Sequence, residues 1–157
     1  MIQNPWQQPS IIRHSQRLLN SYQYWLGKPL LAVKGTPEEI AQTLFEATFV
    51  VVSHGTADNP IFNYANRQAL KQWEMDWDEF TQTPSRASVE PGERDQERQG
   101  LLAKVNTQGY VEGYQGIRVL KTGKRFKIAD VTIWNVLDEL QEFCGQAATY
   151  QQWIPLD

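Results

Sequence analysis

The sequence predicts an α+β fold, in which an antiparallel sheet of five strands carries short helices on one face and is preceded by N-terminal helices. Three observations predict this fold. The chain has 157 residues, the length of one domain. Its apolar periodicity indicates two helices, two strands, several small helices and then three consecutive strands. Strands do not alternate with long crossover helices, which argues against a parallel doubly wound sheet.

The first regular element is a helix over residues 10–27, with Ser10 as its N-cap and Gly27 in its stop signal. Residues 1–9, which precede it, are expected to be a loose arm. The apolar stripe of the helix is broad. It packs either on its own domain or on the same helix of a second chain. The second alternative makes this helix a dimer contact, with the candidate residues Ile11, Leu18, Tyr22 and Trp25.

Capping residues mark the next helices. Thr36 and Glu39 form a capping box around a proline at the first helical position, which predicts a helix after residue 36. Asn66 caps a short helix over about 67–74, and Asp76 caps a further helical turn. A last helix is predicted over 93–107.

Strands are indicated by runs rich in β-branched and aromatic residues. Two lie at Phe49–Val52 and Ile61–Ala65, and three follow as a meander, at Tyr110–Leu120, Arg125–Leu137 and about 142–153. We divide the chain into an arm with a helix, residues 1–35, and a main domain, residues 36–157.

Alternation along 125–137 assigns side chains to the two faces of the sheet. It predicts that Phe126, Ile128 and Trp134 share one face, while Val131 and Ile133 share the other. We therefore expect Trp134 to point into the helix–sheet interior.

Composition excludes several classes of function. The net charge is −3 without a basic stripe, so no nucleic-acid partner is expected. One cysteine and two histidines leave no disulfide framework and no metal site. No apolar run approaches the roughly 20 residues that span a bilayer, so we expect no membrane contact and a cytoplasmic location.

Eight stretches of the sequence carry a family resemblance: Val52–Gly55, Ile61–Asn66, Trp77–Thr81, Pro84–Arg86, Glu93–Arg94, Gly109–Tyr110, Tyr114–Arg118 and Thr132–Asn135. In this combination the chain resembles the MEKHLA family, a PAS-like group, over residues 36 to 153. The resemblance implies a PAS-like fold with a pocket between helices and sheet, and a sensory or regulatory role. The chain lacks the literal string that names the family. It also has no homeodomain or zipper heptads, so a DNA-binding role does not transfer.

PAS relatives that use flavin photochemistry or haem need particular residues. A photoactive flavin domain needs a cysteine beside the pocket, and residues 84–91 contain none. Haem needs an axial ligand such as histidine before the meander, and residues 92–109 contain none. Both cofactors are disfavoured, and the ligand is unknown.

The pocket candidates are arginines and aromatic residues. Arg86 lies where PAS domains form the pocket mouth, and Arg118 lies on the meander; each either holds a carboxylate or pairs with a local acid such as Glu90 or Asp130. The aromatic residues either form a ligand cage or pack in the core. The full set is Asn63, Trp73, Trp77, Ser85, Arg86, Tyr114, Arg118 and Trp134.

Two functions remain open from the sequence. The leading hypothesis is a non-catalytic sensory module that binds a small molecule or a protein partner and acts as a homodimer. The alternative is a small enzyme that uses Ser53, His54, Asp58 and Arg86. Adjacent strand residues point to opposite faces, so Ser53 and His54 are not expected to hydrogen-bond to each other. His14 is expected to be exposed on its helix.

Overall fold

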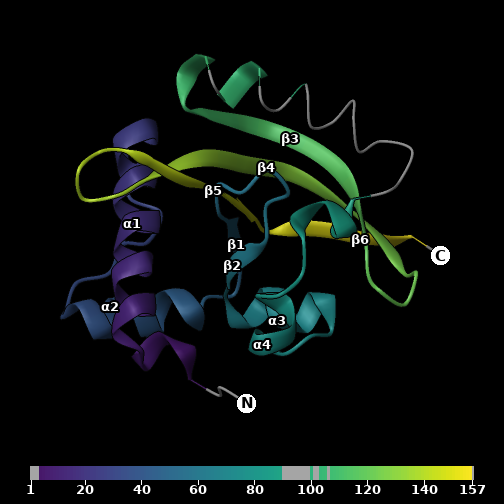
Figure 1. Ribbon diagram of the computed structural model, residues 1–157, viewed down its shortest axis with the longest axis horizontal. Helices are drawn as coiled ribbons and strands as arrows, with labels where there is room; N and C mark the ends of the chain where they lie inside the picture. Colours follow the sequence, from purple (N-terminus) through teal and green to yellow (C-terminus); the bar gives the residue numbers. More distant parts are fainter. Residues whose placement is uncertain (1–3, 90–99, 101–102, 106, 157) are drawn as a thin grey trace.

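The computed structural model describes residues 4–89, 100, 103–105 and 107–156. Within this part of the chain the core is one antiparallel sheet with the order β2-β1-β5-β4-β3, and β6 pairs with β4 as well (Figure 1). The strands are β1 Val50–His54, β2 Phe62–Ala65, β3 Tyr110–Val119, β4 Arg125–Leu137, β5 Phe143–Tyr150 and β6 Gln152–Leu156. The predicted α+β class with an antiparallel sheet is confirmed.

The last predicted strand, 142–153, is two strands in the structure. β5 pairs with residues 132–137 of β4 and β6 pairs with residues 125–129, so the break falls opposite Asp130. Asp130 has a φ of 54°, in the left-handed region, and it interrupts the pleat of β4. The sheet therefore has six strands where the sequence predicts five.

The same interruption changes which side chains share a face. Phe126 and Ile128 lie in one hydrophobic cluster with Val131 and Ile133, on the two sides of Asp130. Trp134 lies in the cluster on the opposite face of the sheet. The predicted alternation along 125–137 is therefore wrong beyond residue 129, because it assumes an unbroken period of two.

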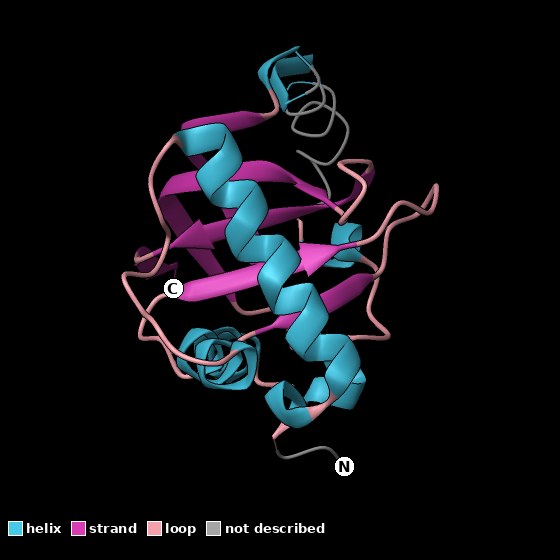
Figure 2. Cartoon of the chain, turned by 90° about the vertical axis from the view of Figure 1, so that its left-hand side faces the viewer, coloured by secondary structure: helices cyan, strands magenta, loops and turns pink. Residues whose placement is uncertain are grey.

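Two helices cover one face of the sheet: α1, Pro9–Leu26, and α2, Pro37–Phe45. α1 lies diagonally across the strands (Figure 2). The capping box of Thr36 and Glu39 is present at the start of α2. The arm is ordered where it is described, because a 3-10 turn, η1, spans Pro5–Gln7 and its Trp6 is buried. This face of the sheet is thus covered both by the arm and helix of residues 1–35 and by α2 of the main domain, residues 36–157.

Short helices cover part of the other face: α3, Arg67–Trp73; α4, Trp77–Phe80; and the 3-10 turn η2, Ser85–Ser88. The predicted cap Asn66 does more than cap α3. Its Oδ1 accepts from the backbone N–H groups of Ala69 and Val51, and its Nδ2 donates to the carbonyls of Phe49 and Leu44. The helix predicted over 93–107 lies largely outside the described residues.

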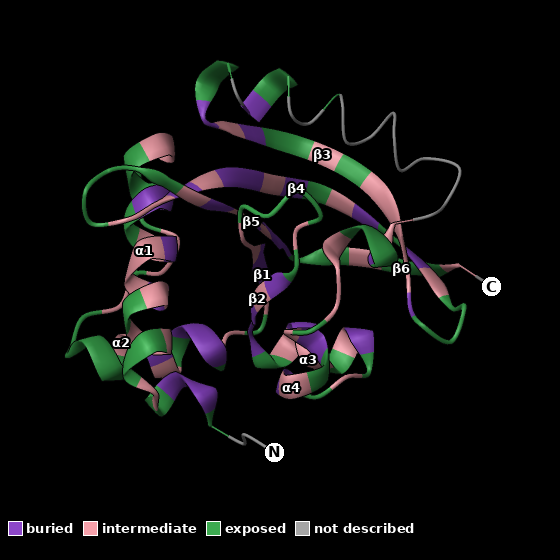
Figure 3. Cartoon of the chain, viewed as in Figure 1, coloured by how far each residue is buried: buried purple, intermediate pink, exposed green. Residues whose placement is uncertain are grey.

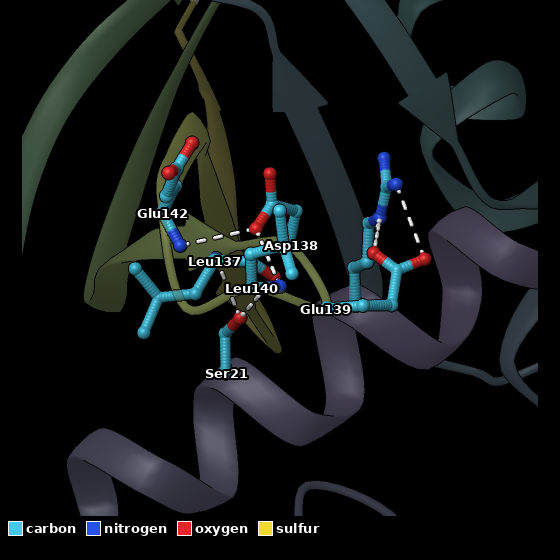
Figure 4. A network of polar contacts seen from close by, with 7 residues as sticks. Ser21, Leu137, Asp138, Glu139, Leu140 and Glu142 are labelled. Atoms are coloured by element: carbon cyan, nitrogen blue, oxygen red, sulfur yellow. Dashed lines mark hydrogen bonds and ion pairs between the residues drawn. The ribbon is translucent and has the colours of Figure 1, made fainter.

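Polar contacts fix α1 to the sheet. The indole Nε1 of Trp134 donates to the carbonyl of Leu18 at 3.2 Å. The Ser21 hydroxyl accepts from the N–H of Leu137 at 2.7 Å, and Figure 4 shows it pointing from α1 to the end of β4. Beside it, Arg17 forms an ion pair with Glu139 of the β4–β5 hairpin at 2.7 Å.

This packing accounts for the broad apolar stripe of α1 within one chain. Leu18 and Tyr22, two of the candidate dimer contacts, are buried, and Tyr22 stacks edge-on against Trp134. Ile11 and Trp25 are half-buried in the same cluster. The central positions of the stripe therefore contact the chain's own sheet, while the β4–β5 hairpin beyond it is exposed (Figure 3).

Candidate functional site

A cavity of about 300 Å³ lies on the face of the sheet that carries α3 and η2. Its floor is the centre of the sheet, and Trp73 of α3 contributes to its wall. A volume of this size is at the lower end of the range of roughly 300–1,000 Å³ for ligand cavities. The apolar and aromatic lining includes Val52, Phe62, Trp73, Ile128, Val131, Ile133, Ala148 and Tyr150.

Two aromatic residues of this lining carry a polar atom. Trp73 is 3% exposed and its Nε1 atom is buried, so the indole presents apolar ring surface to the cavity. Tyr150 donates its hydroxyl to Oε1 of Gln72, and burial raises the pKa of this phenol. Tyr150 therefore stays neutral.

Two arginines lie on the same cavity, Arg86 of η2 and Arg118 of β3. Arg118 pairs with Phe126 across the sheet, so its side chain shares the cavity face. Its guanidinium lies over the ring of Tyr114 at 5.7 Å and donates to the carbonyl of Ile117 at 3.1 Å. The charged side chains that line the described part of the cavity are thus both cationic.

Four of the eight predicted pocket residues line the cavity: Trp73, Ser85, Arg86 and Arg118. Tyr114 packs beside it, beneath Arg118. The other three lie elsewhere. Trp77 contacts Phe45 and Tyr64 on the α2 side, and Trp134 lies under α1. Their placement as pocket residues is corrected to the core, for Trp134 because of the break at Asp130.

Asn63 belongs to a polar chain that also points away from the cavity. Ser53 donates its hydroxyl to Oδ1 of Asn63, and the Ser53 oxygen is 2.9 Å from Nε2 of His14. Because the Ser53 proton goes to Asn63, His14 donates to Ser53 through Nε2. The sequence predicts that Ser53 and His54 do not hydrogen-bond to each other. In the structure the Nδ1 atom of His54 lies 2.9 Å from the carbonyl oxygen of Gly55 instead.

His14 lies on the side of α1 that faces the sheet and is partly buried, not exposed as the sequence predicts. Burial, with a smaller contribution from the charge of Arg17, lowers the pKa of His14 to about 4. The imidazole is therefore neutral at pH 7. The sequence contains a signal for this burial, because His14 precedes Leu18 by four residues and both therefore lie on one face of the helix.

Sequence reasoning missed the part of the lining that comes from β1, β5 and the loop after β1. The missed polar and small residues of these segments include Thr56, Ala57, Gln146, Ala147 and Ala148. Residues of these types form no recognisable motif. In the described part of the chain, no group of three or more His, Cys, Asp or Glu side chains is placed to hold a metal ion. Among the described helices, none has the length and apolar character that crossing a membrane requires.

Comparison with protein families assigns the chain over most of its length. The model of the MEKHLA domain matches residues 12–155. The chain belongs to the MEKHLA domain family. The match begins within α1, so it extends the resemblance that starts near residue 36 toward the N-terminus. Among proteins with curated functions, none matches this MEKHLA chain.

Solved structures with a similar fold are PAS and light-oxygen-voltage domains. The PAS domain of a Colwellia psychrerythraea protein is 14% identical, with a TM-score of 0.62 over 71% of this chain and 92% of that chain. An RNA-binding light-oxygen-voltage receptor is 14% identical, with a TM-score of 0.64 over 83% of this chain and 36% of that chain. A PAS domain from a two-component sensor histidine kinase is 10% identical, with a TM-score of 0.53 over 72% and 89%. At these identities the similarity establishes a PAS-type fold for the MEKHLA chain.

Proposed function

We propose that this MEKHLA chain is a sensory or regulatory module that binds a small organic molecule in the cavity between the sheet and α3 and η2. The observation that carries the proposal is the cavity of about 300 Å³, which has a mostly apolar and aromatic lining together with Arg86 and Arg118. An apolar cavity with a few convergent polar groups is the common form of a ligand site. The PAS-type fold supports the sensory role.

In this proposal, β1 links the ligand to α1. Ser53 lines the cavity with part of its surface, while its hydroxyl contacts His14 of α1 through the opposite face. A shift of β1 on ligand binding would therefore change how α1 sits on the sheet. A signalling partner, or a second copy of the chain, would recognise the outward side of α1 and the adjacent β4–β5 hairpin.

Catalysis by Ser53 and His54 has less support. Ser53 is 1% exposed, and its hydroxyl proton is donated to Asn63 on the face away from the cavity. A nucleophilic serine needs a base that accepts its proton and a substrate that reaches it. We therefore propose a binding module and not an enzyme.

Native mass spectrometry tests ligand binding directly. We expect the purified chain to carry a small molecule, or to gain thermal stability with a member of a metabolite panel, since a ligand at 100 times its Kd adds about 2.7 kcal/mol. The variant Ala148→Phe fills the cavity and should lose that molecule while its circular dichroism stays that of the wild type. A bare wild-type mass together with no thermal shift would overturn the proposal.

A further inference from the structure

We propose that the ligand is an aromatic organic anion, whose ring lies against Trp73 and whose anionic group is held by Arg86 and Arg118. This inference rests on the proposed function and names the class of molecule that the cavity takes. It is carried by the charges and the walls of the cavity, taken together.

The charge of the cavity is opposite to that of the chain. The net charge of the chain is −3, yet the described residues that line the cavity include Arg86 and Arg118 and no aspartate or glutamate. A concave site lined by charges of one sign concentrates its field on ligands of the opposite sign. The described part of the lining therefore favours an anion.

The fold brings Arg86 and Arg118 to the same cavity. A β-bridge joins Val89, just after η2, to Arg118 of β3, so the segment that carries Arg86 lies against the strand that carries Arg118. The ring of Tyr114 supports the Arg118 guanidinium from one side. Planar guanidinium groups match the oxygens of carboxylates and phosphates through paired N–H donors.

Arg86 lies at the mouth of the cavity. Its side chain is exposed and makes no hydrogen bond or ion pair with another described residue. The local acid that sequence reasoning names as an alternative partner, Glu90, lies outside the described residues. An anion at the mouth would give Arg86 a charged partner.

The interior of the cavity selects a ring. Phe62, Trp73 and Tyr150 supply aromatic surfaces, and Val131 and Ile133 close the floor. A volume of about 300 Å³ corresponds to roughly ten water molecules of about 30 Å³ each, which fits one or two fused rings with a short substituent.

Isothermal titration calorimetry with matched probes tests the charge of the ligand. The anionic series is benzoate, 3-phenylpropanoate, 2-naphthoate and phenyl phosphate, and the neutral series is the primary amides of the three carboxylates. We expect wild-type protein to bind an anion at least about tenfold more tightly than the matched amide, because charge-assisted hydrogen bonds are the stronger ones. Phenyl phosphate against benzoate shows which anionic group is preferred.

Three variants locate the binding. Arg86→Gln and Arg118→Gln should each weaken binding of the anion about tenfold without changing that of the amides. Arg13→Gln is the matched control, because Arg13 is exposed on α1 on the other face of the sheet and should bind like wild type.

The outcomes separate this inference from the proposed function. Equal affinity for anions and amides, or unchanged binding in both arginine variants, would overturn the anion while leaving a ligand-binding module in place. A neutral or cationic molecule found by native mass spectrometry on the wild-type chain would do the same. If no probe binds and the mass is bare, both proposals are wrong.

Discussion

The Nε2 atom of His14 lies 2.9 Å from the Oγ atom of Ser53, which joins α1 to a strand whose opposite face borders the cavity. The contact is made by a neutral imidazole, because burial lowers the pKa of His14 to about 4. The packing of α1 on the sheet is therefore sensitive to acid.

Lowering the pH should weaken the fold through His14. Its pKa is lower in the folded chain than the usual 6.5, so the unfolded chain binds more protons between about pH 6.5 and pH 4. The free energy of unfolding therefore decreases as the pH falls through this window, by up to about 3 kcal/mol. Urea unfolding of wild type and His14→Gln at several pH values measures it. Identical pH dependence in the two proteins would contradict the assignment.

Substituting Gly109 should destabilise the chain more than substituting Gly123, a glycine with free space around its Cα. Gly109 has a φ of +84°, and a Cβ there would lie 2.3 Å from the ring of Trp25. Gly123 has a φ of +92° with nothing within 4 Å, so Gly123→Ala pays only the backbone cost of about 1–2 kcal/mol. We expect Gly109→Ala to lose clearly more than this, measured by chemical denaturation. Equal losses would show that Trp25 moves aside without cost.

Removing the Asn66 side chain should be costly for a cap residue. The amide is fully buried, caps α3, and also bonds the main chain of Val51, Phe49 and Leu44. Asn66→Ala should lower the free energy of unfolding by about 3 kcal/mol, because buried partners are left unpaired. Asp76→Ala removes only the cap of α4 and should cost about 1 kcal/mol. The order of the two losses is the result to check, and a reversed order would be inconsistent with the network.

Truncating Leu18 distinguishes packing within the chain from a dimer seam. Leu18 is fully buried beneath α1, so Leu18→Ala should lower the free energy of unfolding by about 3 kcal/mol at any protein concentration. Arg13→Ala, on the exposed side of α1, serves as the control. Unfolding and light scattering are measured over a hundredfold range of concentration. A loss that appears only as a weaker dimer would mean that the helix packs on a second chain.

Local signals predicted much of the fold. The capping box at Thr36 and Glu39 and the cap at Asn66 start helices where the sequence places them, because these side chains bond to neighbours a few residues away. The break at Asp130 could not be predicted in the same way. An aspartate tolerates a positive φ but does not require it, so the flip of Trp134 to the α1 face depends on the assembled sheet.

The candidate site, like the fold, could be predicted from the sequence only in part. Arg86 and Arg118 could be named from their positions in the family pattern, and both line the cavity. Its floor on β1 and β5 could not, since Val52, Ala148 and Tyr150 are ordinary strand residues until pairing brings them together. Sequence periodicity shows that a side chain is buried, but which face buries it depends on register.

A structure of the purified chain determined with its natural contents tests the central claim most directly. We predict an ordered organic molecule in the cavity, with a ring against Trp73 and an anionic group against Arg86. A cavity closed by the chain's own side chains, with no bound molecule, would contradict a ligand-binding role for this domain.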